Sequence, residues 1–177
     1  MMTRVNASLL FPHRKSILLD SNLLLVLLIG AYDPLLLQNF KRVRNFTIDD
    51  YDLLVVLLES HNILLTTPHI LTEISNLANS LPEYIKADWF LSFAAWLQSK
   101  DDIPGLREIW TPAEQLATMP DFAAFGLTDT ALSALAHETM IVTEDRRLSG
   151  VLRQRGLAVL NFDDVRSLRH SGEGRSS

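Results

Sequence analysis

Four acidic side chains occupy positions at which a parallel α/β fold would gather them: Asp20, Glu73, Asp129 and Asp145. Carboxylates that share one site repel and raise one another's pKa, so we expect a cation between them. Oxygen ligands without cysteine or grouped histidine favour Mg²⁺ or Mn²⁺ over Zn²⁺. Two such ions, about 3.5 to 4 Å apart, activate a water molecule and stabilise the leaving oxygen of a phosphodiester. The predicted chemistry is metal-dependent hydrolysis of a nucleic acid.

Short apolar runs separated by amphipathic segments predict strands that alternate with helices. Asp20 directly follows the run 17–19, and Asp145 closely follows the run 140–143. In an open parallel sheet the crossovers are right-handed, so the loops after the strands share one edge, where ligands bind. We therefore expect Asp20 and Asp145 at that edge. The other predicted strands are 63–65, 107–110 and 157–160, and the main predicted helices are 23–29, 35–40, 51–59, 68–79, 83–98, 129–137, 145–152 and 163–169.

Residues that begin or end helices set several of these boundaries. Thr128 and Asp129 stand where an N-cap belongs, ahead of an apolar stripe at helical spacing. Gly30 predicts the end of the first helix. Thr47, with Asp50 three residues later, predicts a capping box in which Asp replaces the usual Glu.

Each acid also has a purely structural explanation. Asp20, Asp129 and Asp145 suit helix caps worth about 1 kcal/mol each, and Glu73 suits a half-exposed helix surface. The two interpretations predict opposite effects. Without metal, asparagine at Asp20 or Asp129 should raise the melting temperature if repulsion dominates, and lower it if the carboxylate is a cap.

The composition predicts one globular domain. The chain has 177 residues, of which 47% are hydrophobic and 21% charged, and it has no cysteine for a disulfide, a thiolate nucleophile or a metal ligand. We expect a lead-in segment at 1–16, one domain at 17–169 and a disordered tail at 170–177. The strongest apolar run, 23–29, is far shorter than the roughly 20 residues of a membrane span, and no signal peptide pattern precedes it. We therefore expect a cytoplasmic protein with no membrane contact.

Charge is distributed unevenly along the chain. The net charge is −5, yet the segment from Arg146 to the end has seven arginines and three acids, which leaves −9 for residues 1–145. Basic side chains near an acidic edge would offset its repulsion for phosphate, so we predict nucleic-acid contacts there. The alternative is that these charges belong to solvated helix faces. The predicted contacts are Arg146 and Arg147, supported by Arg153 and Arg155, and a second group formed by Lys41, Arg42 and Arg44.

Four segments, in this order and separation, resemble the motifs of a PIN domain: ILLDSN at 17–22, PHILTEISNL at 68–77, GLTDTAL at 126–132 and VTEDRRL at 142–148. The resemblance covers roughly residues 17–166. It implies a three-layer α/β/α sandwich with a central, mostly parallel sheet. It also implies an Mg²⁺- or Mn²⁺-dependent endoribonuclease of the kind found as toxins in toxin-antitoxin pairs, with RNA as substrate and an antitoxin protein as partner.

The resemblance also assigns roles to individual residues. The acidic positions of the family, which hold the metal ions and carry catalysis, match Asp20, Glu73, Asp129 and Asp145. Its accessory polar positions, which orient ligands or water, match Asn22 and Thr143. A helix cap at Asn22 and a strand-end hydroxyl at Thr143 are the structural alternatives. His69, four residues before Glu73, is a further candidate to support a ligand.

The stretch between Leu81 and Phe125 has no counterpart in the resemblance. Its aromatic helix, 83–98, is expected to pack on the sheet or on a second copy of the chain. A different function also remains open, namely a PIN-like scaffold that binds RNA or a protein partner without turnover. An aspartyl-phosphate enzyme is disfavoured because its chemistry normally needs a lysine at the end of a strand, and no lysine here follows a core strand.

Overall fold

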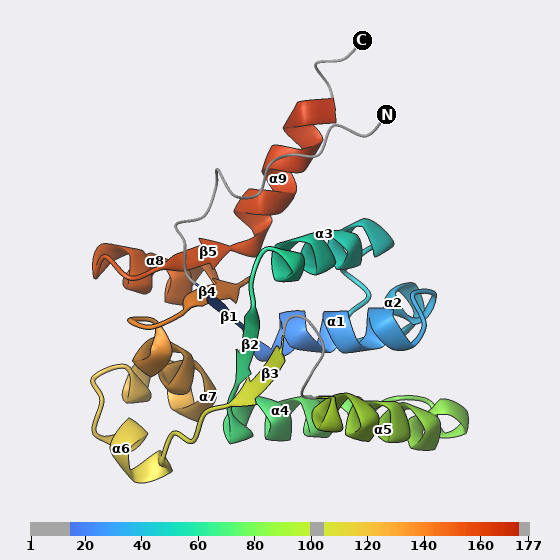
Figure 1. Ribbon diagram of the computed structural model, residues 1–177, viewed down its shortest axis with the longest axis horizontal. Coiled ribbons are helices and arrows are strands. Elements are labelled where there is room, and N and C mark those ends of the chain that lie inside the picture. Colours follow the sequence, from blue (N-terminus) through green and yellow to red (C-terminus); the bar gives the residue numbers. More distant parts are fainter. Residues whose placement is uncertain (1–14, 100–104, 174–177) are drawn as a thin grey trace.

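A five-stranded, all-parallel sheet forms the centre of the molecule (Figure 1). The computed structural model describes residues 15–99 and 105–173. The strand order is β3-β2-β1-β4-β5, and the crossovers therefore reverse direction between β1 and β4. The predicted parallel sheet is confirmed. The strands are β1 (Ser16–Leu19), β2 (Ile63–Thr66), β3 (Gly105–Glu108), β4 (Met140–Thr143) and β5 (Val159–Asn161).

Helices cover both faces of this sheet. In Figure 1, α1 to α5 lie on one side and α6 to α8 on the other, while α9 extends from the end of β5. The predicted three-layer α/β/α sandwich is confirmed. The helices are α1 (Ser21–Tyr32), α2 (Leu36–Asn39), α3 (Ile48–Glu59), α4 (Pro68–Ala78), α5 (Glu83–Gln98), α6 (Ala113–Ala117), α7 (Phe122–Leu135), α8 (Arg146–Gln154) and α9 (Phe162–Glu173).

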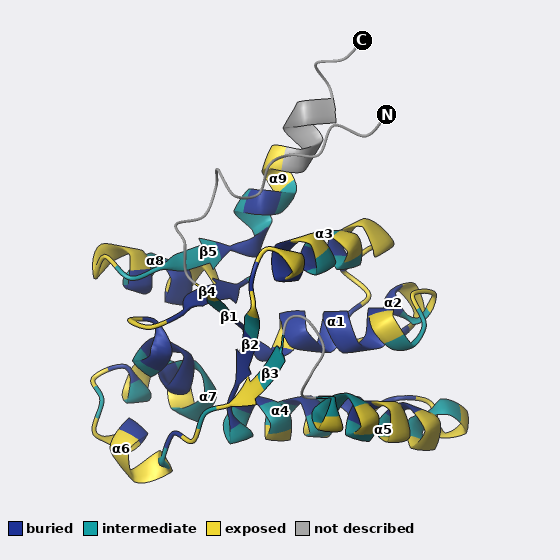
Figure 2. Cartoon of the chain, in the orientation of Figure 1, coloured by how far each residue is buried: buried dark blue, intermediate teal, exposed yellow. Residues whose placement is uncertain are grey.

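Helix α1 is the central helix of its layer and is buried on almost every side (Figure 2). Its apolar residues face β1 and β4 as well as α3, α4 and α5, which explains a helix that is hydrophobic all round. The prediction that Gly30 ends this helix is wrong, since α1 continues to Tyr32. Gly30 instead lets the Tyr51 ring approach, because a Cβ at Gly30 would lie 2.3 Å from Tyr51 Cδ2. Among the described residues, no helix has the length and apolar character that crossing a membrane requires.

The aromatic helix α5 uses its apolar side within the chain. It packs against α1, and its Trp89 and Phe93 are buried in the core with their rings stacked, their centroids 5.3 Å apart. The opposite side of the helix carries Tyr84, which is 82% exposed, and Leu91, which is 70% exposed. Contact with a second copy of the chain stays a prediction.

Helix α9 is held to α3 by a partly buried ion pair, in which the acid is buried and the arginine is 29% exposed. Arg166 donates from Nε to Asp50 Oδ1 at 2.8 Å and from Nη2 to Asp50 Oδ2 at 3.0 Å. Asp50 also accepts the backbone N–H of Thr47 at 2.8 Å, which confirms the predicted capping box. Helix α9 ends at Glu173, so its last residues, 170–173, lie in the segment that was predicted to be a disordered tail. Residues 174–177 and the first fourteen residues of the predicted lead-in lie outside the described residues.

Candidate carboxylate site at the sheet edge

The crevice between the carboxyl ends of β1 and β4 is the point at which the strand order reverses. Ligands of open α/β sheets bind at such points. Asp20 follows β1 directly, and its backbone N–H donates to the carbonyl of Val142 in β4 at 3.0 Å. Glu144 and Asp145 follow β4 directly. The fold therefore brings the two predicted strand-end acids to one crevice.

Asp20 links the two sides of this crevice. Its Oδ1 accepts the backbone N–H of Leu23 at 2.8 Å, which caps α1, and its Oδ2 accepts the backbone N–H of Glu144 at 2.9 Å. Burial raises the pKa of Asp20, and the charge of Glu73 adds to this, while hydrogen bonds from Thr143 and the two backbone groups oppose the rise. The Asp20 carboxylate is thus the N-cap of α1, and it is also a buried group whose pKa is raised.

Thr143 and Asp145 fix the other side. Asp145 caps α8, because its Oδ1 accepts the backbone N–H groups of Arg147 at 2.7 Å and Leu148 at 3.0 Å. The backbone N–H of Asp145 donates to Thr143 Oγ1 at 3.0 Å, and the Thr143 hydroxyl also hydrogen-bonds to Asp20. Thr143 is fully buried. It is therefore placed to orient the Asp20 carboxylate and the backbone of Asp145.

A kink at Gly126 positions Asp129. Gly126 has φ 74° and ψ −169°, so the helix stops there and restarts at residue 127. The predicted N-cap at Thr128 and Asp129 is wrong, because both residues lie inside the restarted turn and the segment 122–125, predicted as a connection, is already helical. The Thr130 hydroxyl donates to the Gly126 carbonyl at 2.5 Å. Asp129 therefore lies in the first turn of the restarted helix, close enough to the other three acids for their charges to act on it.

The charges of the other three acids reach Asp129. The pKa of Asp129 is raised to about 6, first by burial and then by the charges of Asp20, Asp145 and Glu73. Glu73 reaches the crevice from α4, where its Oε2 accepts the Ser21 hydroxyl at 2.9 Å. The other three predicted acids therefore lie near enough to Asp129 for their charges to act on it.

The chemistry of this donor set fits Mg²⁺ or Mn²⁺, because every member is a carboxylate and each oxygen has more than one lone pair to offer. Backbone N–H groups donate to the carboxylates of Asp20 and Asp145 and so orient them. The carboxylate oxygens keep further lone pairs that could bind a metal ion. Within residues 15–99 and 105–173, however, no three acidic or histidine side chains are grouped closely enough to hold a metal ion. A bound ion would have to draw the carboxylates further together.

Sequence analysis missed two members of the crevice. One is Ser21, which binds Glu73. The other is Glu144, whose Oε1 accepts Asn22 Nδ2 at 2.8 Å and whose pKa is raised by burial and then by the charge of Asp20. Asn22 therefore orients a carboxylate, and the helix-cap alternative for it is wrong because Asp20 is the N-cap of α1. Both missed residues are direct neighbours of predicted ones, which was the only signal for them.

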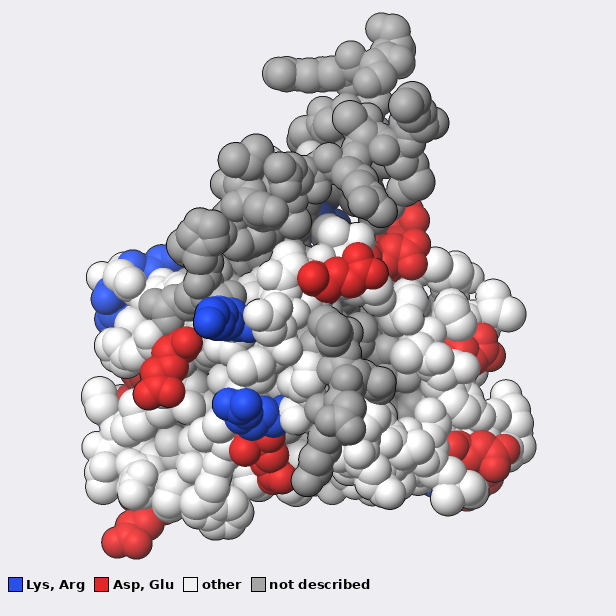
Figure 3. All heavy atoms as spheres, in the orientation of Figure 1, with Lys and Arg blue, Asp and Glu red and all other residues white. Residues whose placement is uncertain are grey.

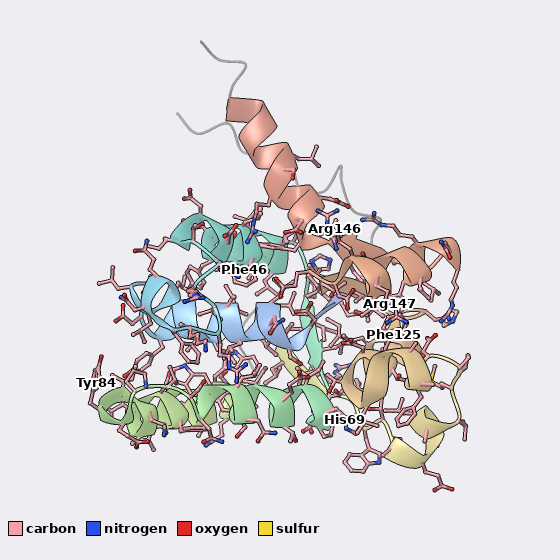
Figure 4. All side chains as sticks on the ribbon, turned by 180° about the vertical axis from the view of Figure 1, so that it is seen from behind. Phe46, His69, Tyr84, Phe125, Arg146 and Arg147 are labelled. Carbon is pink, nitrogen blue, oxygen red and sulfur yellow. The ribbon has the colours of Figure 1, made fainter. Side chains whose placement is uncertain are left out.

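Of the predicted phosphate contacts, Arg147 lies nearest to the site. It donates from Nη1 to the carbonyl of Ala124 at 3.3 Å, and its Cζ lies 4.9 Å from the centre of the Phe125 ring (Figure 4). Arg146 points toward α9, where it pairs with Asp163 at 3.2 Å and Asp164 at 3.7 Å. Arg147 therefore bridges α8 and the start of α7 beside the crevice.

The other predicted basic residues are placed elsewhere. Arg153 pairs with Asp164 at 2.6 Å, and Arg155 pairs with the buried Asp121 at 2.5 Å. On the face shown in Figure 3, basic side chains gather over α8. The second group, Lys41, Arg42 and Arg44, lies exposed in the turn between α2 and α3. No contact of the described residues links this group to the four acids, so its role in binding RNA stays a prediction.

A hollow of about 350 Å³ adjoins the carboxylates. It lies between α4 and the start of α7 and shares Glu73 and Asp129 with the crevice. His69 lines it, and His69 Nε2 donates to the carbonyl of Thr111 at 2.8 Å, which leaves Nδ1 as the acceptor of the ring. The remaining lining residues are Thr72, Asn76, Phe125, Leu127 and Thr128.

Asp129 makes the stability of the metal-free protein depend on pH. Its carboxyl keeps its proton to a higher pH in the folded chain than in the unfolded one, so the free energy of unfolding falls as pH rises from about 4 to 6. Asp129→Asn removes this loss. After discounting for partial exposure, we expect the variant to be more stable by about 1–2 kcal/mol at pH 7 and nearly unchanged below pH 4.

Urea denaturation in EDTA at both pH values measures this difference. Asp88→Asn, which changes an exposed acid on α5, is the matched control. A less stable Asp129→Asn protein at pH 7 would show that the carboxylate is a favourable structural group instead.

For Asp20 the structure supports both of the opposing effects that the sequence analysis considered. Both carboxylate oxygens accept a backbone N–H, and an asparagine has one acceptor oxygen, so its amide would face one of these donors. Asp20→Asn is therefore a poor probe of repulsion, because loss of a buried hydrogen bond opposes the relief of charge.

No protein-family model, no curated protein and no solved structure matches this chain.

Proposed function

We propose that this chain is a cytoplasmic, Mg²⁺- or Mn²⁺-dependent endoribonuclease with a PIN-like fold. The observation that carries the proposal is the convergence of Asp20, Glu73, Asp129 and Asp145 on the crevice between β1 and β4. These acids come from four separate segments, and Asp129, which caps no helix, is buried among the charges of the other three. A divalent cation offsets the repulsion between these charges and supplies catalysis.

The residues around the acids have separate tasks in this proposal. When bound, the metal ions would activate a water molecule and stabilise the leaving oxygen of the phosphodiester. Asp20, Glu73, Asp129 and Asp145 would hold them. Thr143 orients Asp20 and Asp145 through its hydrogen bonds, and Ser21 orients Glu73.

Arg147 completes the arrangement. Its guanidinium lies beside the crevice, where it would bind the phosphate backbone of the RNA and lower the repulsion between RNA and the acidic site. The role as a toxin held by an antitoxin protein follows from the resemblance to PIN domains and is part of the proposal.

Metal dependence tests the proposal directly. The purified wild-type protein is expected to cleave an end-labelled single-stranded RNA in MnCl₂ or MgCl₂, to lose this activity in EDTA, and to regain it when Mn²⁺ is restored. Calorimetric titration with MnCl₂ should show binding in the absence of RNA. Cleavage that persists in EDTA would reject the metal mechanism.

The second candidate is a PIN-like scaffold that binds RNA or a protein without turnover. It is favoured by the spacing of the carboxylates, since no three of the described acidic or histidine side chains are grouped as a metal site. The calorimetric experiment separates the two candidates. A scaffold gives no heat of Mn²⁺ binding and leaves RNA intact.

A further inference from the structure

The hollow beside the carboxylates is lined by polar side chains from α4 and by both polar and apolar side chains from α7. Its α4 wall is a stripe of side chains at helical spacing, formed by His69, Thr72, Glu73 and Asn76. Its α7 wall runs from Phe125 to Asp129 across the kink at Gly126. The volume of about 350 Å³ lies at the lower end of the range for small-ligand sites.

The lining groups match the chemistry of a nucleobase. The Phe125 ring offers a flat apolar surface, and the Asn76 side chain offers both a donor and an acceptor. Proteins recognise unpaired bases by stacking them on aromatic rings and by hydrogen bonds to their edges. Arg147 lies over the Phe125 ring and holds it in place from α8. A base in this hollow would set its own phosphate beside Glu73 and Asp129.

An exposed tryptophan is linked to the hollow through His69. Trp110 is 75% exposed, an unusual state for so large an apolar side chain. The next residue, Thr111, accepts the hydrogen bond from His69, and His69 lines the hollow, so Trp110 directly precedes the hydrogen-bond partner of a lining residue. Exposed aromatic rings bind single-stranded nucleic acids by stacking with bases, largely without sequence preference.

We propose that the hollow is a nucleobase subsite for single-stranded RNA. One base stacks on Phe125 and hydrogen-bonds to Asn76, and a flanking base stacks on Trp110. The phosphate between the bound base and its neighbour then lies at the carboxylates, with Arg147 beside it. This inference rests on the proposed ribonuclease function and names the form of RNA that the site takes.

Binding of a labelled ten-nucleotide single-stranded RNA, measured by fluorescence anisotropy in CaCl₂, tests the subsite. The length of the RNA is checked after each titration, so that cleavage does not distort the binding curve. Trp110→Ala and Asn76→Ala change exposed side chains and should not affect folding. Each is expected to raise the Kd about 10-fold or more, since stacking and base contacts of this kind have such effects.

Two controls identify the base as the bound group. Tyr84→Ala removes an equally exposed aromatic ring at the opposite end of the molecule from His69 and Phe125, and should leave the Kd unchanged (Figure 4). An abasic strand of the same length should bind the wild-type protein more weakly than RNA does. It should also bind the wild-type, Trp110→Ala and Asn76→Ala proteins equally well.

The outcomes distinguish this inference from the ribonuclease proposal. Equal binding of RNA by the wild-type protein and both variants overturns the subsite, and leaves metal-dependent cleavage to stand or fall by its own assay. Base-dependent binding that the two variants weaken, without cleavage in Mn²⁺, supports the subsite and rejects the nuclease. Failure of the wild-type protein to bind RNA overturns the subsite and assigns Trp110 to another surface role, such as contact with a protein.

Discussion

Asp129→Asn is expected to lower the rate of Mn²⁺-dependent cleavage of single-stranded RNA at least 100-fold. Asp129 is the acid on which the charges of Asp20, Asp145 and Glu73 all act, so it lies where a shared cation would bind. Loss of a group that merely supports a metal ligand costs about 10- to 100-fold, and loss of a ligand itself should cost more. Single-turnover cleavage of a labelled RNA in excess Mn²⁺ measures the rate.

The same variant excludes unfolding as the cause of inactivity. In the absence of metal at pH 7 it is expected to be more stable than the wild-type protein, so a drop in rate reflects the site. Asp88→Asn removes an exposed acid from α5 and should cleave at the wild-type rate. A rate within about three-fold of wild type for Asp129→Asn would refute the assignment of this acid as a ligand.

Asp50→Ala is expected to lower the free energy of unfolding by about 2–3 kcal/mol, because it removes both the capping-box acceptor of α3 and the buried acid of a partly buried ion pair. Asp50 is 5% exposed and accepts two hydrogen bonds from Arg166 as well as those that cap α3. The Arg166 guanidinium also lies 5.2 Å from the centre of the Phe46 ring and 5.5 Å from that of Phe162. Equilibrium unfolding in urea measures the loss.

Asp52→Ala is the matched control for this experiment. Asp52 lies two residues further along α3, is exposed, and should change stability by less than about 0.5 kcal/mol. The double variant Asp50→Ala/Arg166→Ala should lose less than the sum of the single losses, because the two residues act as a pair. Strict additivity, or a loss below about 1 kcal/mol for Asp50→Ala, would contradict the role given to this ion pair.

The central strands β1, β2 and β4 could be predicted from sequence because they are almost fully buried. A run such as 140–143 is apolar at every position, which is typical of parallel strands covered on both faces, and the observed β4 has the same limits. Capping also follows local rules, and Thr47 and Asp50 form the predicted box. The end of α1 was mispredicted because Gly30 is needed for its contact with Tyr51, which only the tertiary packing reveals.

The details of the site depend on long-range contacts that a local pattern does not contain. Which of Glu144 and Asp145 approaches Asp20 is decided by the register between β1 and β4, in which Leu19 pairs with Val142. The partners of Arg146, Arg153 and Arg155 likewise depend on how α8 packs against its neighbours. The sequence indicates which groups are charged, but their spatial partners decide which of them remain to meet a ligand.

The hydrogen bond from the Glu144 backbone to Asp20 joins residues 124 positions apart, and it forms only when β4 has paired with β1. A nascent chain that ends before β4 would already contain Asp20, Glu73 and Asp129, yet would lack the strand that orders them. Because such distant pairings form late, assembly of the acidic crevice should follow the release of most of the chain from the ribosome.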